Sequence, residues 1–442
     1  GSSTDAIAGS PPGDGLAVAA AAAADLPATS PCRRPWGGSC RRMPQLAMAA
    51  RRLPGNLVLP HGRCLLSAMS DMASHTLEKR SINDLLQLAE RPAEFRALQL
   101  HETLKVGLAR CAVRLGEMPF GFCNSPSIKH VSAAYVHNFR QVVEYEHRKG
   151  VAGLMDEEYH ELTRNILNQH RGTMLDVAKG VWEFREDLGL LFGDNLELAE
   201  VREDLRLIKD VEANLDEFFT ERLTLRLLIT HVQKLNQWNP LEKPAGKEMV
   251  GVVNVNTQPI SILSRAFVAA RFMCMRDFQA APDLKVNGVM HDEYILSEIS
   301  RQQHFPYVHT HLFYIFLELV KNAARASIER AQQDRGDLSQ VPSISILVPE
   351  EQYTWDRERS VKLADKGTGM SRGTLSKAFC YFFSSVKARP TVAHELSDFD
   401  RRVPLAGFGF GLPISRVMAR YFCGDIDLNS IPGQGTDVYV YL

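Results

Sequence analysis

One segment of the sequence places four polar side chains on what would be a single helix face. Glu318, Lys321, Asn322 and Arg325 stand at i, i+3, i+4 and i+7, so at about 100° per residue they share one narrow arc. A carboxylate can take a proton from a hydroxyl group, and an amide oxygen suits a hard cation such as Mg²⁺. The row therefore predicts a metal–triphosphate site with a base beside it. A solvated face with i, i+3 and i+4 pairs is the structural alternative.

A second candidate is an aspartate at the end of a strand-like run. Asp365 follows the run Ser360–Ala364, and Gly367 and Gly369 come after it at alternate positions. A carboxylate there can accept a hydrogen bond from an exocyclic amine such as that of adenine. The glycines let the backbone turn tightly against a ligand. The pattern predicts a nucleotide contact, with an ordinary turn after a strand as the alternative.

A third segment alternates glycine with phenylalanine. Gly407, Gly409 and Gly411 run directly into an expected helix with Pro413 in its first turn. Backbone N–H groups at a helix N-terminus form an anion site when no side chains obstruct them. The spacing differs from the dinucleotide fingerprint Gly-x-Gly-x-x-Gly. The segment predicts phosphate binding, and a flexible hinge is the alternative.

The order of the three segments adds to their meaning. Residues 370–406 lie between two loops that are expected to contact the nucleotide, so they are predicted to form a lid. Thr436 begins the last strand-like run and could brace Asp365 or the base with its hydroxyl group.

The elements that must position these residues fall into two halves. Residues 74–240 carry apolar side chains at spacings of three and four, which predicts long helices in an antiparallel bundle. From Val250 onward, helices alternate with strand-like runs, which indicates an α/β or α+β layer domain. The expected strands are 250–255, 343–348, 360–364, 425–430 and 436–442.

Residues 1–73 differ from the rest of the chain. They are rich in Ala, Pro, Gly and Ser, and no acidic residue lies between Asp25 and Asp71, whereas seven arginines do. An Arg-rich, acid-poor leader is typical of organelle transit peptides. A disordered tail without a targeting role is the alternative.

Composition excludes several classes of protein. Lys and Arg number 51 against 52 Asp and Glu, a net charge of −1, so the basic footprint of nucleic-acid binders is missing. No run approaches the roughly 18 apolar residues of a membrane span. The 8 cysteines form no Cys-x-x-Cys pair, which favours a reducing compartment and argues against a structural metal site.

Together the motifs resemble the ATP-binding domain shared by the gyrase, heat-shock chaperone, histidine kinase and mismatch-repair ATPases. Within that superfamily, Glu318–Ala326 and Gly407–Arg416 are similar to the signatures of the mitochondrial 2-oxo-acid dehydrogenase kinases. In the helical half, Asn124–Ile128, Val143–Glu146 and the segment from Leu215 to Arg226 resemble the family's bundle. The resemblance covers roughly residues 75–442.

The resemblance implies an α+β fold: an N-terminal helical bundle followed by an α/β sandwich ATP-binding domain, whose mixed sheet has helices on one face. The expected domains are the leader 1–73, the bundle 74–240 and the kinase domain 241–442. The implied activity is a Ser/Thr protein kinase of the mitochondrial matrix that uses ATP and Mg²⁺. It would phosphorylate and inactivate the E1 subunit of a 2-oxo-acid dehydrogenase complex, with pyruvate favoured over the branched-chain type. Implied partners are that E1, an E2 lipoyl domain and a second copy of the chain, with no nucleic acid and no membrane span.

The resemblance also assigns roles to residues. Glu318 would be the general base, Asn322 would bind Mg²⁺, and Lys321 and Arg325 would steady the phosphates or the Glu318 carboxylate. Tyr314 stands where some relatives have a histidine, one helical turn before Glu318. The residues expected to bind the nucleotide are Asn322, Asp365, Gly367, Gly369, Ser384, Ser385, Gly407, Phe408, Gly409, Phe410, Gly411, Leu412 and Thr436.

Two other functions are compatible with such a domain. A histidine-kinase-like phosphotransferase would need a phospho-acceptor histidine in a helix ahead of the domain, and no such motif or receiver-like segment is evident. An ATP-gated scaffold could hold the dehydrogenase complex without catalysing, but the retained base and metal positions argue against it.

Overall fold

The computed structural model describes residues 64–192, 204–236, 248–290, 304–335, 338, 340–348, 360–383 and 409–442, all of which belong to the compact unit Gln45–Leu442. Residues 1–63 of the predicted leader lie outside the described residues, as does the predicted domain boundary at residue 240. Ser384, Ser385, Gly407 and Phe408 also lie outside them. No described helix combines the length and the apolar character that a bilayer crossing requires.

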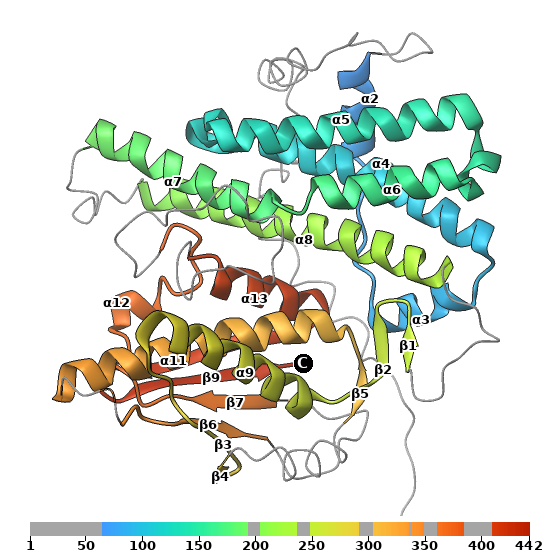
Figure 1. The fold of residues 1–442 in the computed structure, drawn as a ribbon. Coiled ribbons are helices and arrows are strands. Elements are labelled where there is room, and N and C mark those ends of the chain that lie inside the picture. Colours follow the sequence, from blue (N-terminus) through green and yellow to red (C-terminus); the bar gives the residue numbers. More distant parts are fainter. Residues whose placement is uncertain are drawn as a thin grey trace, which may run out of the picture. The chain divides into compact units, whose positions relative to one another are not determined.

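The first part of the described chain is helical (Figure 1), which confirms the predicted bundle. Pro126 occupies the first position of its helix, where a missing N–H costs nothing, and Gly150 ends that helix with a φ of 64°. Two short 3₁₀ turns, η2 (Pro119–Asn124) and η3 (Val151–Met155), connect the longer elements. The helices are α2 (Leu65–Ala73), α3 (Ile82–Glu90), α4 (Ala93–Gly116), α5 (Pro126–Lys149), α6 (Glu157–Gln169), α7 (Thr173–Phe192) and α8 (Asp204–Asn236).

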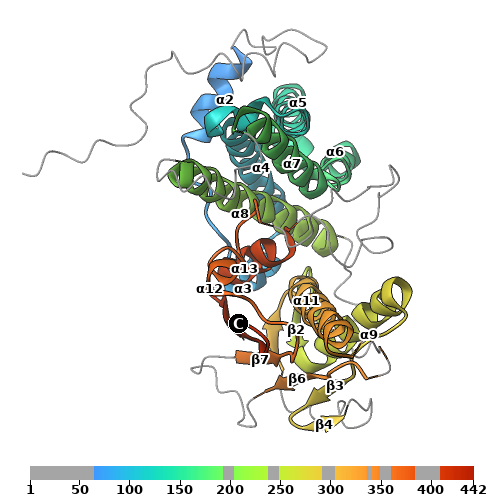
Figure 2. The same cartoon turned by 90° about the vertical axis from the view of Figure 1, so that its left-hand side faces the viewer.

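The bundle packs around a core of periodic apolar side chains, and Figure 2 shows α5 and α6 nearly end-on beside the oblique α8. Leu104 and Leu108 of α4, Phe139 of α5 and Phe218 of α8 are completely buried in one cluster. Helix α2 falls within the range predicted as leader, and its Met69 packs into the same cluster. Burial of an aromatic or leucine side chain contributes about 1.5–3 kcal/mol each, so this cluster is the main source of stability of the bundle.

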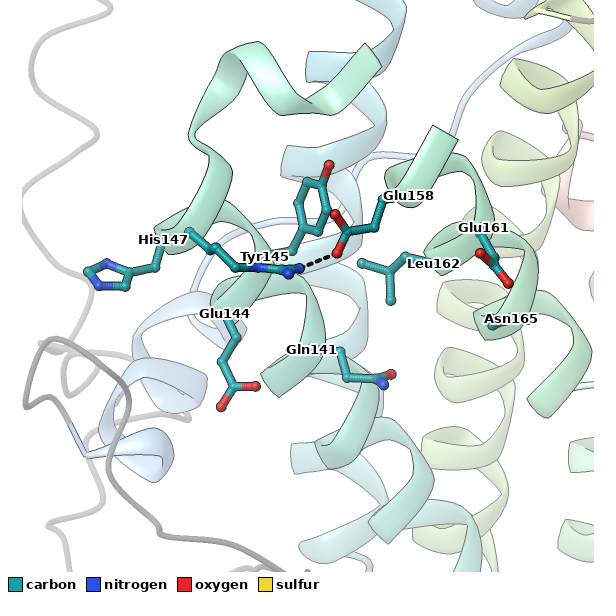
Figure 3. Close-up of a pocket in the computed structure, with 9 residues that line it drawn as sticks. Gln141, Glu144, Tyr145, His147, Glu158, Glu161, Leu162 and Asn165 are labelled. Atoms are coloured by element: carbon teal, nitrogen blue, oxygen red, sulfur yellow. Dashed lines mark hydrogen bonds and ion pairs between the residues drawn. The ribbon is translucent and has the colours of Figure 1, made fainter. Parts of the chain in front are cut away.

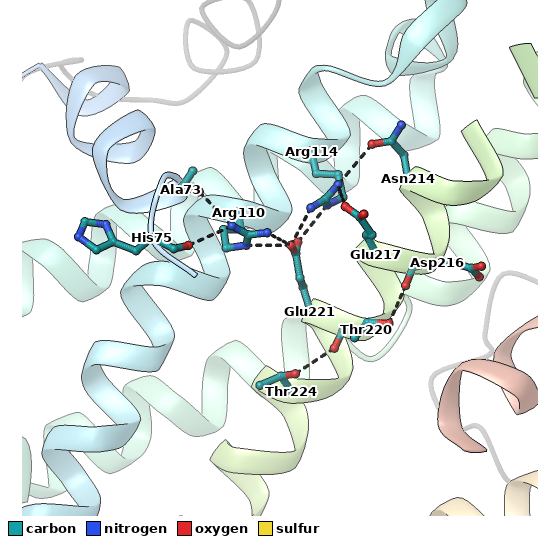
Figure 4. Close-up of polar contacts among 10 residues, drawn as sticks. All are labelled: Ala73, His75, Arg110, Arg114, Asn214, Asp216, Glu217, Thr220, Glu221 and Thr224. Carbon is teal, nitrogen blue, oxygen red and sulfur yellow. Dashed lines mark hydrogen bonds and ion pairs between the residues drawn. The ribbon is translucent and has the colours of Figure 1, made fainter. Parts of the chain in front are cut away.

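A buried carboxylate fixes helix α8 against α4 (Figure 4). Glu221 Oε1 accepts hydrogen bonds of 2.8 Å from Arg110 Nε and Arg114 Nη2, and its Oε2 accepts one of 3.2 Å from Arg114 Nε. A buried charge is tolerated only when it is paired and hydrogen-bonded. The network therefore fixes the position of α8 along α4, and α8 carries Asp216 and Phe219.

The second part of the described chain contains two sheets. A three-stranded sheet has the order β1-β2-β5, with β1 (Met249–Val250), β2 (Val253–Thr257) and β5 (Phe305–Tyr307). A six-stranded sheet has the order β4-β3-β6-β7-β9-β8, with β3 and β6 parallel and the other pairs antiparallel. Its strands are β3 (Leu284–Val286), β4 (Val289–Met290), β6 (Ile344–Leu347), β7 (Ser360–Ala364), β8 (Asp425–Ile431) and β9 (Gly435–Tyr441), and the accompanying helices are α9 (Pro259–Phe278), α11 (His309–Arg335), α12 (Arg372–Leu375) and α13 (Gly411–Tyr421).

Alternation along the strands gives the larger sheet one buried face. Every second residue, such as Ile346, Leu363 and Val440, is buried in one cluster with Leu312 and Phe316 of α11. This mixed sheet under helices confirms the predicted fold class (Figure 1). The arrangement places the end of β7 beside the start of β9, so Asp365 and Thr436 meet there.

Candidate functional site

The predicted base lies on α11 in a tight pair with a lysine. Lys321 Nζ donates a 2.8 Å hydrogen bond to Glu318 Oε1, and the exposed fractions of the two side chains are 4% and 14%. The i, i+3 spacing on one helix brings the two groups together. Lys321 is thus almost fully withdrawn from solvent, and its ammonium group contacts the site through this ion pair. Of the two roles expected for Lys321, the contact with the Glu318 carboxylate is the one observed.

The first residue of α13 lies against the same carboxylate. A Cβ atom built on Gly411 would overlap Oε2 of Glu318 and would lie 3.1 Å from its Cδ. The last glycine of the glycine-rich segment and the acidic end of the helix row are therefore neighbours, as the sequence interpretation requires. Glu318 is held on one oxygen by Lys321 and faces the helix N-terminus with the other.

The other two members of the helix row differ in their surroundings. The Asn322 side chain is exposed. Arg325 donates from Nε to Glu329 Oε1 at 2.7 Å, an i, i+4 pair, and not to Glu318. Glu329 was missed in the sequence interpretation, although its spacing from Arg325 could have revealed it. The expectation that Arg325 steadies the Glu318 carboxylate is therefore not what the structure shows.

Asp365 follows β7 in a buried position. Its Oδ1 accepts hydrogen bonds from the backbone N–H of Gly367 at 2.8 Å and of Thr436 at 3.2 Å. Burial raises the pKa of Asp365 to about 6, and the two backbone N–H groups oppose that rise. Among the described residues, both hydrogen bonds go to Oδ1, which leaves Oδ2 to accept from a ligand amine.

Backbone approach explains the glycines around Asp365. A Cβ atom on Gly367 would lie 2.6 Å from the carbonyl carbon of Ala326 on α11. Gly369 has a φ of 67°, and a Cβ atom there would lie 2.8 Å from the carbonyl carbon of Ile431. These glycines thus let the loop after β7 fit between α11 and the β8–β9 turn. The Thr436 hydroxyl contacts Ser430 at 2.9 Å, and its backbone N–H, not its hydroxyl, supports Asp365.

Phe410 has a packing role that the sequence interpretation missed. Its ring is 3% exposed, and its centroid lies 5.0 Å from that of Tyr381 and 5.9 Å from that of Phe219. Tyr381 in turn donates a 2.7 Å hydrogen bond to Asp216 Oδ1 of α8. Any nucleotide contact of Phe410 would therefore involve its backbone. The alternation of Phe and Gly in the sequence indicated a role for the glycines but not the burial of the Phe410 ring.

The donors at this site fit a magnesium nucleotide. Asp365 offers a buried acceptor for an amine, the exposed Asn322 amide offers an oxygen for a hard cation, and the N-terminus of α13 has no side-chain cap from Phe410. Within the described ranges, no group of three or more His, Cys, Asp or Glu residues could hold a metal ion alone. A metal here would need oxygens from the ligand itself, as Mg²⁺ on phosphates commonly has. Gly409 (φ 76°) and Leu412 flank this N-terminus.

A separate hollow of about 550 Å³ opens between α5 and α6 (Figure 3). None of the predicted site residues lines it, and two of its lining residues, Arg148 and Glu158, form an ion pair. The lining residues are Gln141, Glu144, Tyr145, His147, Arg148, Glu158, Glu161, Leu162 and Asn165. This hollow is therefore distinct from the site around Glu318.

Comparison with protein families gives two matches along the chain. Residues 79–254 match the family described as mitochondrial branched-chain alpha-ketoacid dehydrogenase kinase. Residues 307–442 match the family described as histidine kinase-, DNA gyrase B-, and HSP90-like ATPase. The second range contains all the nucleotide-binding residues predicted from the sequence.

Several curated proteins are similar over most of the chain. A mitochondrial pyruvate dehydrogenase (acetyl-transferring) kinase, isozyme 3, of Mus musculus is 29% identical over 343 residues, which cover 78% of this chain and 75% of the relative. A mitochondrial kinase of the same name from Arabidopsis thaliana is 28% identical over 368 residues, 82% of this chain and 89% of the relative. Isozyme 4 of Rattus norvegicus is 28% identical over 347 residues, 78% and 75% of the two chains.

Proposed function

Because this chain belongs to the mitochondrial 2-oxo-acid dehydrogenase kinases, a family of ATP-dependent protein serine/threonine kinases, we propose that it phosphorylates the E1 subunit of such a complex and thereby inactivates it. Pyruvate dehydrogenase E1 is the favoured substrate, because the similar curated proteins are named pyruvate dehydrogenase kinases. The branched-chain E1 is the alternative, which the family matched by residues 79–254 supports.

The observation that carries this proposal is the position of the Glu318 carboxylate. It lies between the Lys321 ammonium group and the first residue of α13, the helix that follows the glycine-rich segment. A carboxylate held there can accept the proton of a serine or threonine hydroxyl as that oxygen bonds to the γ-phosphorus of ATP, while the bond from this phosphorus to the bridging oxygen breaks and ADP leaves. General bases of this kind contribute about 10²–10⁴-fold to a rate, and phosphoryl transfer depends mainly on such positioning.

The remaining residues bind the nucleotide in this proposal. Asp365 accepts from the adenine amine through Oδ2, and the backbone N–H groups at the start of α13 receive phosphate oxygens. Asn322 holds Mg²⁺, which when bound neutralises charge on the phosphates. Lys321 orients Glu318, and Arg325, paired with Glu329, borders the same helix face.

The proposed partners extend beyond the substrate. We infer an E2 lipoyl domain as the docking partner and a second copy of the chain as a dimer partner. Support for the dimer comes from the sheet face opposite α11, where Tyr439 and Tyr441 are only half-buried and Lys362 lies over the Tyr439 ring at 5.4 Å. The relatives are named as mitochondrial, and the Arg-rich leader supports the matrix as the compartment.

The test is transfer of labelled phosphate from ATP with Mg²⁺ to purified pyruvate and branched-chain E1 in parallel, followed by mapping of the modified residue. Labelling of a serine or threonine of one E1 is the expected result. Acid-labile phosphate on a histidine of the chain itself would instead identify a histidine-kinase-like enzyme. Nucleotide binding without transfer to either E1 would identify an ATP-gated scaffold.

A further inference from the structure

The glycine that begins α13 faces a functional side chain. A Cβ atom on Gly411 would overlap Oε2 of Glu318, whose other oxygen accepts from Lys321 Nζ at 2.8 Å. The carboxylate is therefore enclosed from two sides, by an ammonium group on Oε1 and by a bare α-carbon at Oε2. Because the Glu318 side chain is only 14% exposed, it has little room in which to move aside.

The other glycines of the site meet different neighbours. Gly367 approaches the backbone of Ala326, and Gly369 approaches the backbone of Ile431. Both therefore satisfy the packing of the loop after β7. Among the glycines whose surroundings the structure describes at this site, Gly411 is the one whose missing side chain leaves space for the predicted base.

Backbone conformation does not require glycine at position 411. Gly411 has no positive φ, and it occupies the first position of a helix, where alanine is well tolerated. Steric space is therefore the requirement, and the atom that needs the space belongs to Glu318. A methyl group there would push the end of a side chain and leave the surrounding backbone in place.

We propose that Gly411 is a positioning residue for Glu318, so that the last glycine of the Gly-x-Gly-x-Gly segment seats the catalytic carboxylate and is not needed to admit the nucleotide. Lys321 then binds one carboxylate oxygen of Glu318, and Gly411 leaves room for the other. This inference rests on the proposed kinase function. The backbone N–H of Gly411 remains part of the anion-binding N-terminus of α13, whereas the absence of its side chain makes room for the base.

The test is a double-mutant cycle between Gly411→Ala and Glu318→Asp, with transfer to E1 and nucleotide affinity measured for each protein. Gly411→Ala alone should lower kcat at saturating ATP by about 100-fold, the effect of roughly 1 Å of misplacement, while the nucleotide Kd changes by less than about threefold. Aspartate withdraws the carboxylate by one methylene, about 1.5 Å. In the Glu318→Asp background the added methyl group should therefore cost less than about fivefold in kcat.

Gly172→Ala is the matched control, because a Cβ atom there would meet only Asp176 Oδ2 at 3.5 Å and the φ is ordinary; it should leave kcat and Kd unchanged. Equal losses of kcat in the two Glu318 backgrounds would overturn the proposal, and so would a tenfold or larger loss of nucleotide affinity with kcat retained. If Gly411→Ala does not fold, the double variant Glu318→Ala/Gly411→Ala tests whether the clash with Glu318 is the cause. Recovery of a cooperative thermal transition supports the contact, and continued failure to fold contradicts it. Absence of transfer by the wild-type protein contradicts the kinase function itself, which is a different result.

Discussion

Lys321 Nζ lies 2.8 Å from Oε1 of Glu318, and the lysine side chain is 4% exposed. This pair lies on α11, one turn beyond Tyr314, and faces the first residue of α13. The hydrogen bond from a buried ammonium group holds one oxygen of the carboxylate in place. The pair therefore gives Glu318 a defined position, which a catalytic base requires.

Replacing Lys321 by methionine should impair transfer more than nucleotide binding. The change keeps a side chain that reaches as far as Cε and removes the charge, so Glu318 loses the hydrogen bond from Lys321 Nζ. We expect kcat to fall by about 10–100-fold from misplacement of the base and the free energy of unfolding to fall by about 1–3 kcal/mol, since one partner of a largely buried pair is removed. Steady-state kinetics and urea unfolding measure both effects. The exposed Lys209 of α8 provides the control through Lys209→Met, and equal kinetic losses in the two variants would contradict the role of Lys321.

Asp365 should make the protein less stable as the pH rises toward 6. Burial raises its pKa to about 6 from the usual 3.8, so the fold favours the protonated form. Its contribution to stability is complete below about pH 4 and is lost as the pH rises through 6; at most it amounts to about 3 kcal/mol. Urea unfolding should be measured at several pH values for Asp365→Asn and for the wild type. The free energy of unfolding of the variant should rise relative to that of the wild type between pH 4 and 6, and the difference should stay constant above pH 6. A difference that is independent of pH would contradict this assignment.

The same residue should control nucleotide affinity. Asp365→Ala removes the acceptor for an amine and also the partner of the Gly367 and Thr436 N–H groups. We expect nucleotide binding, measured by titration calorimetry, to be abolished in this variant. Retained affinity would place the adenine elsewhere.

Local patterns in the sequence predicted the elements better than their contacts. The run Ser360–Ala364 is β7 as observed, and the β8–β9 hairpin follows the Pro-Gly-x-Gly turn, because alternation and turn residues act over short distances. Strands β3, β4 and β5 have only two or three residues, too few for any periodicity to show. Strands β3 and β5 pair with β6 and β2 from distant parts of the chain, and β4 pairs with β3 across a tight turn.

The sequence indicated which residues share a helix face or a loop at the site, but little of how their side chains pack. Helical spacing placed Glu318 beside Lys321, and the order of the motifs implied that Asp365 and the glycine-rich segment share one site. Helical spacing could not reveal that Lys321 is buried or that Gly411 faces Glu318, because both depend on how other parts of the chain pack against α11. Arg325 shows the opposite failure, since its partner Glu329 lies on its own helix, beyond the segment that was considered.

His231 should contribute to loss of stability in acid. It is completely buried; its Nδ1 accepts from Val252 N–H at 3.2 Å and its Nε2 lies 3.0 Å from Leu85 O. Burial lowers its pKa to about 4 from 6.5, so its contribution is complete above pH 6.5 and is lost as the pH falls through 4, up to about 3 kcal/mol. His231→Asn should flatten the dependence of the urea midpoint on pH between 6.5 and 4.5. Burial also lowers the pKa of His311 to about 4, so His311 should preserve part of the dependence of the urea midpoint on pH. An unchanged dependence in His231→Asn would contradict the role of His231.

Two substitutions of Tyr381 should separate the contributions of its hydroxyl group and of its ring to the free energy of unfolding. Its hydroxyl donates to Asp216, and its ring stacks on Phe219 and meets Phe410. Tyr381→Phe should cost about 1–2 kcal/mol of unfolding free energy by leaving Asp216 without that donor, whereas Tyr381→Ala should cost about 3–5 kcal/mol by removing the ring. Similar losses in the two variants, measured by chemical unfolding, would show that the ring contributes little.

In the proposed reaction Glu318 takes the proton from the substrate hydroxyl, and the variant Glu318→Gln tests this role. Glutamine preserves the size of the side chain and cannot accept that proton. Transfer of labelled phosphate from ATP to E1 should fall by at least about 10²-fold, with the nucleotide Kd nearly unchanged. Wild-type rates of transfer in Glu318→Gln, at full nucleotide occupancy, would contradict the assignment of Glu318 as the base.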